Sequence, residues 1–576
     1  GVMVAIEASD AGRRVLTPVG SNVRTRVHEY GGAAHLPTSE GLHYVNFRDQ
    51  LLYRAGEESR PLTVPGCRFA DLVEAGQHLV GVREDHRGED VRNAIVRLDP
   101  STTGAGELLW GESDFVAYPR VSQDGRRLAW IAWNHPDMPW DATTLYVADL
   151  GPDGLSHVQA VAGGEGISVI EPQWTADGAL VHISDESGFW NLHVWRDGAR
   201  RSIAPTRAEF AGPLWGLGQS NYGLFNDGRI VAIHASDGGD RLIVLSPDRG
   251  ATSLPLPFTT LRNLQVAGED RVVLIAASAT ESGSVVSVDL RDGSWERIHQ
   301  PSPVWLDERY ISRPEPITFP TAGGLDCHAL YYAPHNGDFD APAGERPPLI
   351  VQAHGGPTGQ ASAAFNLGIQ FWTSRGFAVV DVDYGGSSGY GRAYRQRLQG
   401  QWGIVDVEDV IAAARFLIDS GRVDPARVAI HGGSAGGFTV LAALTRSDVF
   451  KAGGDFYGVA DLEALARDTH KFESRYLDGL VGPYPEAQDV YMARSPIHHL
   501  EGFRAPLLIL QGAEDPIVPP NQARMIRDAL RSRQAPVAYI EFAGEGHGFR
   551  RSENVVAAKQ AELYFYGRVF GFRPAD

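Results

Sequence analysis

The sequence predicts an N-terminal all-β propeller followed by a C-terminal α/β domain with a doubly wound, mostly parallel sheet. Paired short strands recur about every 40–50 residues in the first part of the chain. Buried strands alternate with helices from about residue 315 onward, a pattern typical of a parallel sheet covered by helices. We therefore expect a propeller domain at 1–305 and an α/β domain at 306–576.

The propeller prediction depends on six hairpins that follow one another at similar spacing. An array of β-sandwiches is the rival fold, and the recurring period disfavours it. Turn dipeptides separate strands at Asp124-Gly125, Asp177-Gly178, Asp227-Gly228 and Asp292-Gly293. The expected strand pairs are Leu42–Val45 with Leu51–Arg54, Leu79–Val82 with Ala94–Arg97, Leu128–Ile131 with Thr144–Val147, Leu180–Ile183 with Asn191–Val194, Ile230–Ile233 with Arg241–Val244, and Val272–Ile275 with Val285–Val288.

The first residues of the chain suggest part of a seventh blade. Val2–Glu7 and Arg14–Leu16 have the pattern of outer strands whose inner partners are missing. Either the chain is truncated, or the end of the propeller supplies the missing strands. We thus expect six to seven blades, the first of them incomplete.

The pattern changes after a proline-rich stretch, Pro301–Pro320, which we expect to be the hinge between the domains. Ala378–Val382 is apolar enough for a strand buried on both faces. Val405–Ser420 has one apolar face and is expected to be a helix.

A Gly-x-Ser-x-Gly motif marks a candidate nucleophile. The apolar strand Arg427–His431 runs into Gly432–Gly437, and the helix Phe438–Thr445 follows. Small residues on both sides of Ser434 allow a sharp strand-to-helix turn that presents the hydroxyl at a helix N-terminus. A glycine-rich turn with an exposed serine would look similar. Whether Ser434 is a nucleophile therefore depends on whether the sequence also offers an acid and a base.

An acid and a base follow Ser434 in the chain order Ser, Asp, His that α/β-hydrolases use. The buried strand Ala505–Gly512 ends just before two acids, Glu514 and Asp515. A helix at about Asn521–Arg533, a strand at Val537–Phe542 and a glycine-rich loop with His547 come next. These contexts predict a catalytic triad of Ser434, His547 and one of the two acids.

The oxyanion of an acyl-transfer reaction needs two backbone N–H donors. The residue after the nucleophile, Ala435, supplies one. The loop His354–Pro357, which follows the expected strand Pro348–Ala353, supplies the other, and we expect it to be Gly356, with Gly355 as the alternative.

Composition excludes several other classes of protein. The 576 residues carry a net charge of −19, which argues against partners such as nucleic acid or an anionic membrane. No apolar stretch is long enough to span a bilayer, and no leader pattern opens the chain, although it does not begin with Met. Only Cys67 and Cys327 are present, which fits a reducing cytoplasm. No histidine spacing indicates a metal, and we expect no cofactor.

The motifs together resemble the prolyl oligopeptidase family of serine peptidases, most closely its acylaminoacyl-peptidase and dipeptidyl-aminopeptidase-like branch. The resemblance spans the chain, and its strongest stretches include His354–Pro357, Tyr384–Arg392, His431–Gly437, Asp515–Pro519 and Gly546–Gly548. It implies that Asp515 rather than Glu514 completes the triad, because the family pattern places the acid three residues before a valine. It also implies a propeller that admits short peptides and excludes folded proteins.

The chain departs from the family pattern at three places. Relatives often have Asn-Tyr-Arg-Gly-Ser where this chain has Asp383–Ser387, and the incomplete first blade is a second departure. Some members hold the substrate backbone with an arginine two residues after the triad acid, where this chain has Ile517. Arg475 is the candidate for that role. An aromatic floor is expected for the first specificity pocket, with Tyr384, Tyr390, Phe456 and Tyr457 as open candidates, and Tyr384 is the one expected to contact substrate.

The expected function is a serine peptidase that hydrolyses short peptides, as an exopeptidase of acylaminoacyl-peptidase or aminopeptidase type. An esterase, amidase or transpeptidase acting on a specialised small substrate is the alternative, as is a carboxypeptidase. The acid pairs Glu84-Asp85 and Asp185-Glu186 are open candidates for holding a substrate ammonium group. We expect a cytoplasmic location, and the sequence leaves a homo-oligomer open.

Overall fold

The computed structural model describes the chain except residues 1, 7–11, 57–59, 237–238, 302–304 and 575–576. The chain forms two compact units, one of residues 1–276 and 283–301, the other of residues 277–282 and 302–576. The short segment 277–282 belongs to the second unit although both of its neighbours belong to the first, which the sequence pattern did not indicate. Within the second unit, the Ser278 carbonyl accepts a hydrogen bond from the Phe365 N–H at 2.7 Å.

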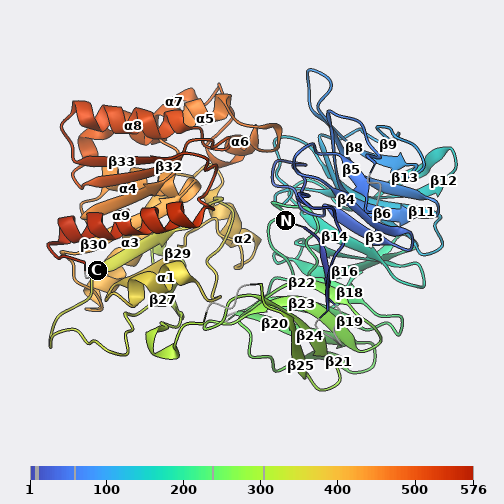
Figure 1. Cartoon of the computed structure of the whole chain (residues 1–576), viewed down its shortest axis with the longest axis horizontal. Coiled ribbons are helices and arrows are strands. Elements are labelled where there is room, and N and C mark those ends of the chain that lie inside the picture. Colours follow the sequence, from blue (N-terminus) through green and yellow to red (C-terminus); the bar gives the residue numbers. More distant parts are fainter. Residues whose placement is uncertain (1, 7–11, 57–59, 237–238, 302–304, 575–576) are drawn as a thin grey trace. The chain divides into compact units, whose positions relative to one another are not determined.

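The first unit is a propeller of six antiparallel sheets that follow one another along the chain (Figure 1). The first sheet has the order β3-β4-β5, and each later one has four strands in chain order. The first three sheets contain β3 (His35–Thr38), β4 (Gly41–Val45) and β5 (Leu52–Arg54); β6 (Cys67–Ala75), β7 (His78–Asp85), β8 (Arg92–Leu98) and β9 (Glu107–Trp110); and β10 (Phe115–Val121), β11 (Arg127–Trp133), β12 (Thr144–Gly151) and β13 (Gly154–Gly163). The last three contain β14 (Val169–Trp174), β15 (Leu180–Ser184), β16 (Asn191–Arg196) and β17 (Ala199–Ser202); β18 (Tyr222–Leu224), β19 (Ile230–Ser236), β20 (Gly239–Ser246) and β21 (Gly250–Ser253); and β22 (Thr260–Val266), β23 (Arg271–Ala277), β24 (Ser284–Asp289) and β25 (Trp295–His299).

All six predicted hairpins are confirmed, one in each blade. They are the antiparallel pairs β4/β5, β7/β8, β11/β12, β15/β16, β19/β20 and β23/β24. The four Asp-Gly dipeptides lie in turns within blades. At Asp124-Gly125, the aspartate side chain accepts hydrogen bonds from the Ser122 hydroxyl and the Arg126 N–H, and the glycine has a φ of 72°. A positive φ favours glycine, which explains why these dipeptides punctuate the strands.

The suggested seventh blade is wrong. β1 (Val4–Ile6) and β2 (Arg13–Val15) pair with each other in a two-stranded sheet of their own, and the described strands of this unit otherwise form six blades. The blade with fewer strands is instead β3-β4-β5, which has three in the part of the chain that the structure describes. A single bridge between Tyr53 and Pro61 stands where the other blades have a fourth strand.

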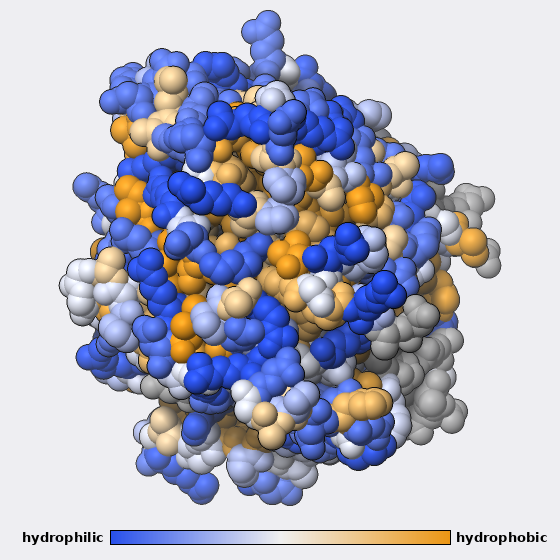
Figure 2. Space-filling model, turned by 90° about the vertical axis from the view of Figure 1, so that its left-hand side faces the viewer, coloured by the Kyte–Doolittle hydropathy of each residue, from blue (hydrophilic) through white to orange (hydrophobic). Residues whose placement is uncertain are grey.

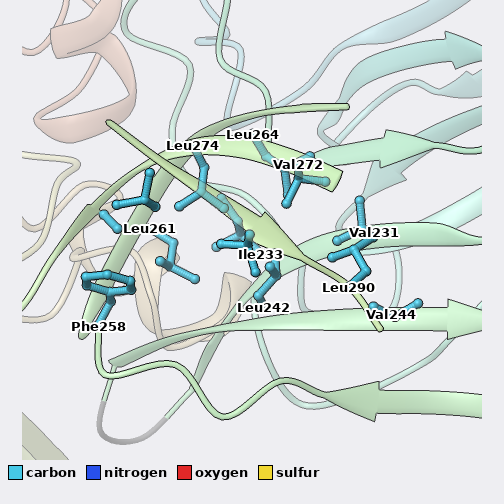
Figure 3. Packing of buried hydrophobic residues seen from close by; sticks show 13 residues of the cluster. Val231, Ile233, Leu242, Val244, Phe258, Leu261, Leu264, Val272, Leu274 and Leu290 are labelled. Atoms are coloured by element: carbon cyan, nitrogen blue, oxygen red, sulfur yellow. The ribbon is translucent and has the colours of Figure 1, made fainter. Parts of the chain in front are cut away.

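Apolar side chains fill the space between neighbouring blades. Figure 3 shows one such cluster, between the last two blades, where Val231 and Ile233 of β19 pack with Leu264 of β22 and with Val272 and Leu274 of β23. Each of these side chains is at least 95% buried. Alternating inward and outward side chains on each strand allow both faces of every sheet to pack against a neighbouring blade.

The second unit contains an eight-stranded sheet in the order β26-β27-β29-β28-β30-β31-β32-β33. β27 runs antiparallel to both of its neighbours, and all strands from β29 to β33 are parallel. The strands are β26 (Glu315–Pro320), β27 (Asp326–Tyr332), β28 (Leu349–Ala353), β29 (Ala378–Asp383), β30 (Val428–Gly433), β31 (Ala452–Phe456), β32 (Leu507–Gly512) and β33 (Val537–Phe542). The last six residues of the proline-rich stretch that was expected to be a hinge form the edge strand β26. An edge position tolerates proline because one side of the strand needs no hydrogen-bonded partner.

Helices cover both faces of this sheet. α1 and α9 share a core with one face, in which Trp372 and Tyr566 lie 5.5 Å apart between ring centroids. α3 and α4 contact each other and the strands β28 and β30. The helices are α1 (Leu367–Thr373), α2 (Arg392–Arg395), α3 (Val405–Asp419), α4 (Ala435–Arg446), α5 (Leu462–Arg467), α6 (Tyr476–Leu480), α7 (Gln488–Arg494), α8 (Pro520–Ser532) and α9 (Ser552–Phe570). The doubly wound, mostly parallel sheet is confirmed.

In the part of the chain that the structure describes, no helix is long and apolar enough to cross a bilayer. On the face shown in Figure 2, hydrophobic residues gather toward the middle, and hydrophilic residues surround them.

Candidate active site

Three strands of the parallel sheet end beside one another, and each leads to one of the predicted triad residues. Ser434 directly follows β30, Asp515 follows β32, and His547 lies in the loop after β33. Because β30 to β33 are consecutive and parallel in the sheet, their carboxyl ends meet at the same edge.

Ser434 occupies a strained backbone conformation between β30 and α4. Its φ of 58° and ψ of −122° are unfavourable for a residue with a side chain. The turn is tight enough to require glycine on both sides. A Cβ at Gly432 would lie 2.6 Å from the Gly436 carbonyl oxygen, and a Cβ at Gly436 would lie 2.2 Å from the oxygen of Ala353. This is the geometry of a nucleophile elbow.

His547 forms a hydrogen bond with Asp515, between Nδ1 and the carboxylate Oδ2, at 2.8 Å. The Asp515 side chain is fully buried, whereas Glu514, the competing acid, is exposed. Since Nδ1 carries the proton that Asp515 accepts, Nε2 is the basic nitrogen of the neutral ring.

Tyr457 links the histidine loop to the nucleophile turn. Its ring centroid lies 4.8 Å from that of His547, and its ring atoms would lie 3.0–3.3 Å from a Cβ on Gly433, the residue before Ser434. Burial, together with the charges of Asp515 and Asp455, raises the pKa of Tyr457 to about 12, so the phenol stays neutral. A neutral aromatic ring therefore lies against both the base and the residue before the nucleophile.

A small pocket opens beside Ser434. It holds about 40 Å³ and is lined mainly by apolar side chains, with Thr469 and Glu473 as polar exceptions. The two expected oxyanion donors, Gly356 and Ala435, line the same pocket. Ala435 is the first residue of α4, so its N–H has no partner within the helix. Gly355, the alternative donor, packs against the turn itself, since a Cβ there would lie 3.6 Å from the Ser434 Cβ.

Comparison with known proteins places this geometry in a family. Residues 363–573 match the model of the prolyl oligopeptidase family. Over its whole length the chain is similar to a solved structure, a puromycin-hydrolyzing peptidase of Mycobacterium tuberculosis. The two are 41% identical, with a TM-score of 0.94, and the match covers 98% of this chain and 90% of the other. The chain belongs to the prolyl oligopeptidase family.

Two curated members of the family are also similar, over part of their length. The dipeptidyl aminopeptidase BIII of Pseudoxanthomonas mexicana is 32% identical over 42% of this chain and 35% of its own length. The acylamino-acid-releasing enzyme of Sus scrofa is 25% identical over 80% of this chain and 59% of its own length. The matches thus span less than two thirds of either relative.

The aromatic residues of the pocket are ones that the sequence did not indicate. Trp402 and Tyr476 line it, whereas the four expected aromatic residues, Tyr384, Tyr390, Phe456 and Tyr457, are not among its lining residues. Tyr457 lies beside His547 instead. Trp402 precedes α3 and Tyr476 begins α6, so no single motif contains both.

Tyr384 supports the oxyanion loop from within and does not face the pocket. It has no exposed surface, its ring stacks on His354 with centroids 4.3 Å apart, and its hydroxyl donates to the His354 carbonyl at 2.9 Å. Burial lowers the pKa of His354 to about 4, so this ring is neutral, and its Nε2 accepts from the Ser387 hydroxyl at 2.7 Å. The expectation that Tyr384 contacts substrate is corrected, because a buried ring leaves no surface for one.

Arg475 lies just before α6, and its side chain is half exposed. Its Nε donates to Asp478 Oδ2 at 2.6 Å. Ile517, which occupies the position of the arginine found in some relatives, lines the pocket beside Ser434.

The two acid pairs of the propeller are engaged within that unit. Glu84 accepts from the His28 N–H at 2.9 Å and forms an ion pair with Arg68, and Asp85 pairs with Arg87. Asp185 is buried and accepts from the Ser168 N–H at 2.8 Å, while Glu186 pairs with Arg200.

Among the residues that the structure describes, no group of three or more His, Cys, Asp or Glu side chains could hold a metal ion.

Proposed function

We propose that this protein is a serine peptidase that cleaves short peptides through an acyl-enzyme. The observation that carries the proposal is the 2.8 Å contact between His547 and the buried Asp515, at the carboxyl ends of the parallel strands, where Ser434 follows β30 in a strained turn. A paired acid and base beside an elbow serine form an acyl-transfer site. Membership of the prolyl oligopeptidase family supports this reading.

In the proposed reaction, Ser434 Oγ attacks the substrate carbonyl carbon while His547 Nε2 takes the hydroxyl proton. Asp515 stabilises the imidazolium that forms. The N–H groups of Ala435 and Gly356 hold the oxyanion, and each such donor contributes roughly 3–4 kcal/mol to the transition state. The C–N bond then breaks as His547 returns the proton to the leaving amine. A water molecule, deprotonated by His547, attacks the acyl ester and releases the acid and free Ser434.

We propose that cleavage occurs at the amino end of the substrate, as in an exopeptidase. The names of similar proteins support this, since they include a dipeptidyl aminopeptidase and an acylamino-acid-releasing enzyme. The alternatives of an esterase or transpeptidase on a small specialised substrate, and of a carboxypeptidase, share the same acyl chemistry. The apolar pocket beside Ser434 favours an apolar side chain at the cleaved residue.

A second substrate follows from the similarity to the puromycin-hydrolyzing peptidase, which covers nearly all of this chain. We propose that the protein also hydrolyses puromycin, whose aminoacyl group is joined to its nucleoside by an amide bond. Under this proposal, the same site hydrolyses both peptide and amide substrates.

We also propose that the propeller restricts entry to short substrates and that Arg475 holds the substrate backbone. A cytoplasmic location is also proposed, supported by two cysteines that are free and buried.

The test is a mass-resolved digest of one short peptide in three forms: free at both ends, N-acetylated and C-amidated. Puromycin and a simple ester are assayed beside it. Loss of one or two residues from the free amino end supports an aminopeptidase or dipeptidyl peptidase, and cleavage of the acetylated form alone supports an acylaminoacyl peptidase. Loss from the carboxyl end would reverse the proposed polarity. Hydrolysis of the ester alone would replace the peptidase proposal with an esterase.

Ser434→Ala is the matched control in every digest. It should abolish turnover and leave substrate binding intact. Activity near that of the wild type in this variant would exclude Ser434 as the nucleophile.

A further inference from the structure

The helix α9 contacts both elements that carry the reacting side chains. Near its C-terminal half, Glu562 Oε1 accepts from His431 Nδ1 at 2.6 Å, and His431 lies on β30 three residues before Ser434. At its N-terminal end, Glu545 accepts from the N–H groups of Arg550 and Arg551, each at 2.9 Å. Glu545 lies two residues before His547.

Both ring nitrogens of His431 lie against side-chain oxygens. Nδ1 lies against the Glu562 carboxylate, and Nε2 lies 3.1 Å from Gln352 Oε1. His431 is therefore held on both sides of its ring, by Gln352 of β28 and by Glu562 of α9.

Glu562 is fully buried and is surrounded by groups that favour its charge. Lys559 Nζ lies 3.1 Å from Oε2, and the Tyr566 hydroxyl donates to Oε1 at 3.0 Å. Burial opposes ionisation, but Lys559 and His431 outweigh it and lower the pKa of Glu562 to about 2. Removing this carboxylate would leave the Lys559 ammonium and the His431 ring without their common partner, which is costly in a buried site.

Glu545 connects the loop of His547 to the N-terminal end of α9 through several hydrogen bonds. Besides the two backbone N–H groups, it accepts from Asn554 Nδ2, in the first turn of α9, at 2.8 Å. It is 2% exposed. A carboxylate at a helix N-terminus also meets the positive end of the helix dipole. The loop of His547 and the strand that leads to Ser434 thus both form hydrogen bonds with α9.

We propose that Glu562 and Glu545 are positioning residues, through which α9 fixes the strand of Ser434 and the loop of His547 relative to each other. The strained backbone at Ser434 persists only if its surroundings hold it. A misplacement of about 1 Å between reacting groups can lower a rate about 100-fold. This inference rests on the proposed function, since it assigns the two carboxylates to the geometry of that site.

The test compares Glu562→Gln and Glu545→Gln with Glu553→Gln, which alters an exposed acid on the same helix. Three quantities are measured: the rate constant for labelling Ser434 with a fluorophosphonate, kcat and KM for the best peptide substrate, and the melting temperature. We expect the first two variants to lose about tenfold or more in labelling rate and in kcat, with KM within twofold. Glu553→Gln should match the wild type. A role in stability alone would lower the melting temperature and leave kcat per folded molecule unchanged.

The inference is overturned if folded Glu562→Gln and Glu545→Gln are labelled and turn over within twofold of the wild type. If Glu562→Gln does not fold, the double variant Lys559→Met/Glu562→Gln removes one charge of each sign and is measured instead, with the same expected loss. A wild-type protein that the fluorophosphonate does not label would show that the proposed function has failed. Labelling of the wild type with no loss in the variants would show that only the role of α9 has failed.

Discussion

Asp515 holds His547 with one carboxylate oxygen while the other oxygen is fixed by the backbone. Oδ2 accepts from His547 Nδ1 at 2.8 Å, and Oδ1 accepts from the N–H groups of Ile517 and Val518 at 2.9 and 3.0 Å. The carboxylate therefore cannot rotate without breaking all three bonds. It sets the orientation and the tautomer of the imidazole.

We expect Asp515→Asn to lower kcat by about 10⁴-fold, because an amide in this place favours the wrong tautomer of His547. KM should change little, since Asp515 does not line the pocket. Steady-state kinetics on the best peptide substrate measure both values. Glu514→Gln is the matched control and should stay near the wild type, because Glu514 is exposed. The reverse result would make Glu514 the triad acid.

Tyr384→Phe tests the support of the oxyanion loop. The change removes a buried hydroxyl that donates to the His354 carbonyl and leaves the stacked ring in place. We expect a loss of about 1 kcal/mol in the free energy of unfolding, from thermal or denaturant melts. A fall in kcat of about tenfold, with KM within twofold, should accompany it as Gly356 shifts.

The control for Tyr384→Phe is Tyr539→Phe, whose hydroxyl contacts Glu541 on the edge strand β33. It should leave kcat unchanged. Equal kcat values in the wild type and both variants would show that Tyr384 has no part in placing the loop.

The doubly wound sheet and a candidate triad could be predicted because each depends on a local pattern. A buried strand, a glycine-rich turn and a polar residue at the strand end lie together in the sequence at Ser434, Asp515 and His547. The parallel sheet then requires that their carboxyl ends meet. The six hairpins of the propeller are local in the same sense, since turn and strands are neighbours in the chain.

What could not be predicted depends on packing between distant segments. Trp402 and Tyr476 come from different helical regions, and only the folded chain brings both to the pocket. Tyr384 lies in a motif near the site, but its complete burial follows from packing against His354. An isolated hairpin such as β1–β2 has the same pattern as part of a blade, so only its pairing distinguishes the two.

Thr469→Val tests the polar part of the pocket. The Thr469 hydroxyl oxygen is buried and has no hydrogen-bond partner among the described residues. Replacing it with a methyl group removes an unsatisfied polar atom, so we expect the free energy of unfolding to stay the same or rise by about 1 kcal/mol. The ratio of kcat/KM for leucine over serine at the cleaved residue should rise severalfold. An unchanged ratio would show that the hydroxyl has no influence on the bound side chain.

Asp455, on β31 behind the nucleophile turn, should make stability depend on pH near neutrality. Its Oδ1 accepts from the Gly458 N–H at 2.9 Å, and its Oδ2 is buried without a hydrogen-bond partner among the described residues. Burial, opposed by the Gly458 bond, raises the pKa of Asp455 to about 7 from an ordinary value of 3.8. The folded protein therefore binds more protons than the unfolded chain between about pH 4 and pH 7.

The contribution of Asp455 to the free energy of unfolding accordingly falls as the pH rises through that window, by up to about 1.4 kcal/mol for each unit of pH. Asp455→Asn has no proton to lose at this position, while every other titrating group is common to both proteins. We expect the melting temperature of Asp455→Asn, relative to that of the wild type, to be higher at pH 8 than at pH 5. Melts of both proteins at the two pH values measure this difference. A difference that is the same at both would mean that Asp455 is ionised throughout, with a partner that offsets its burial.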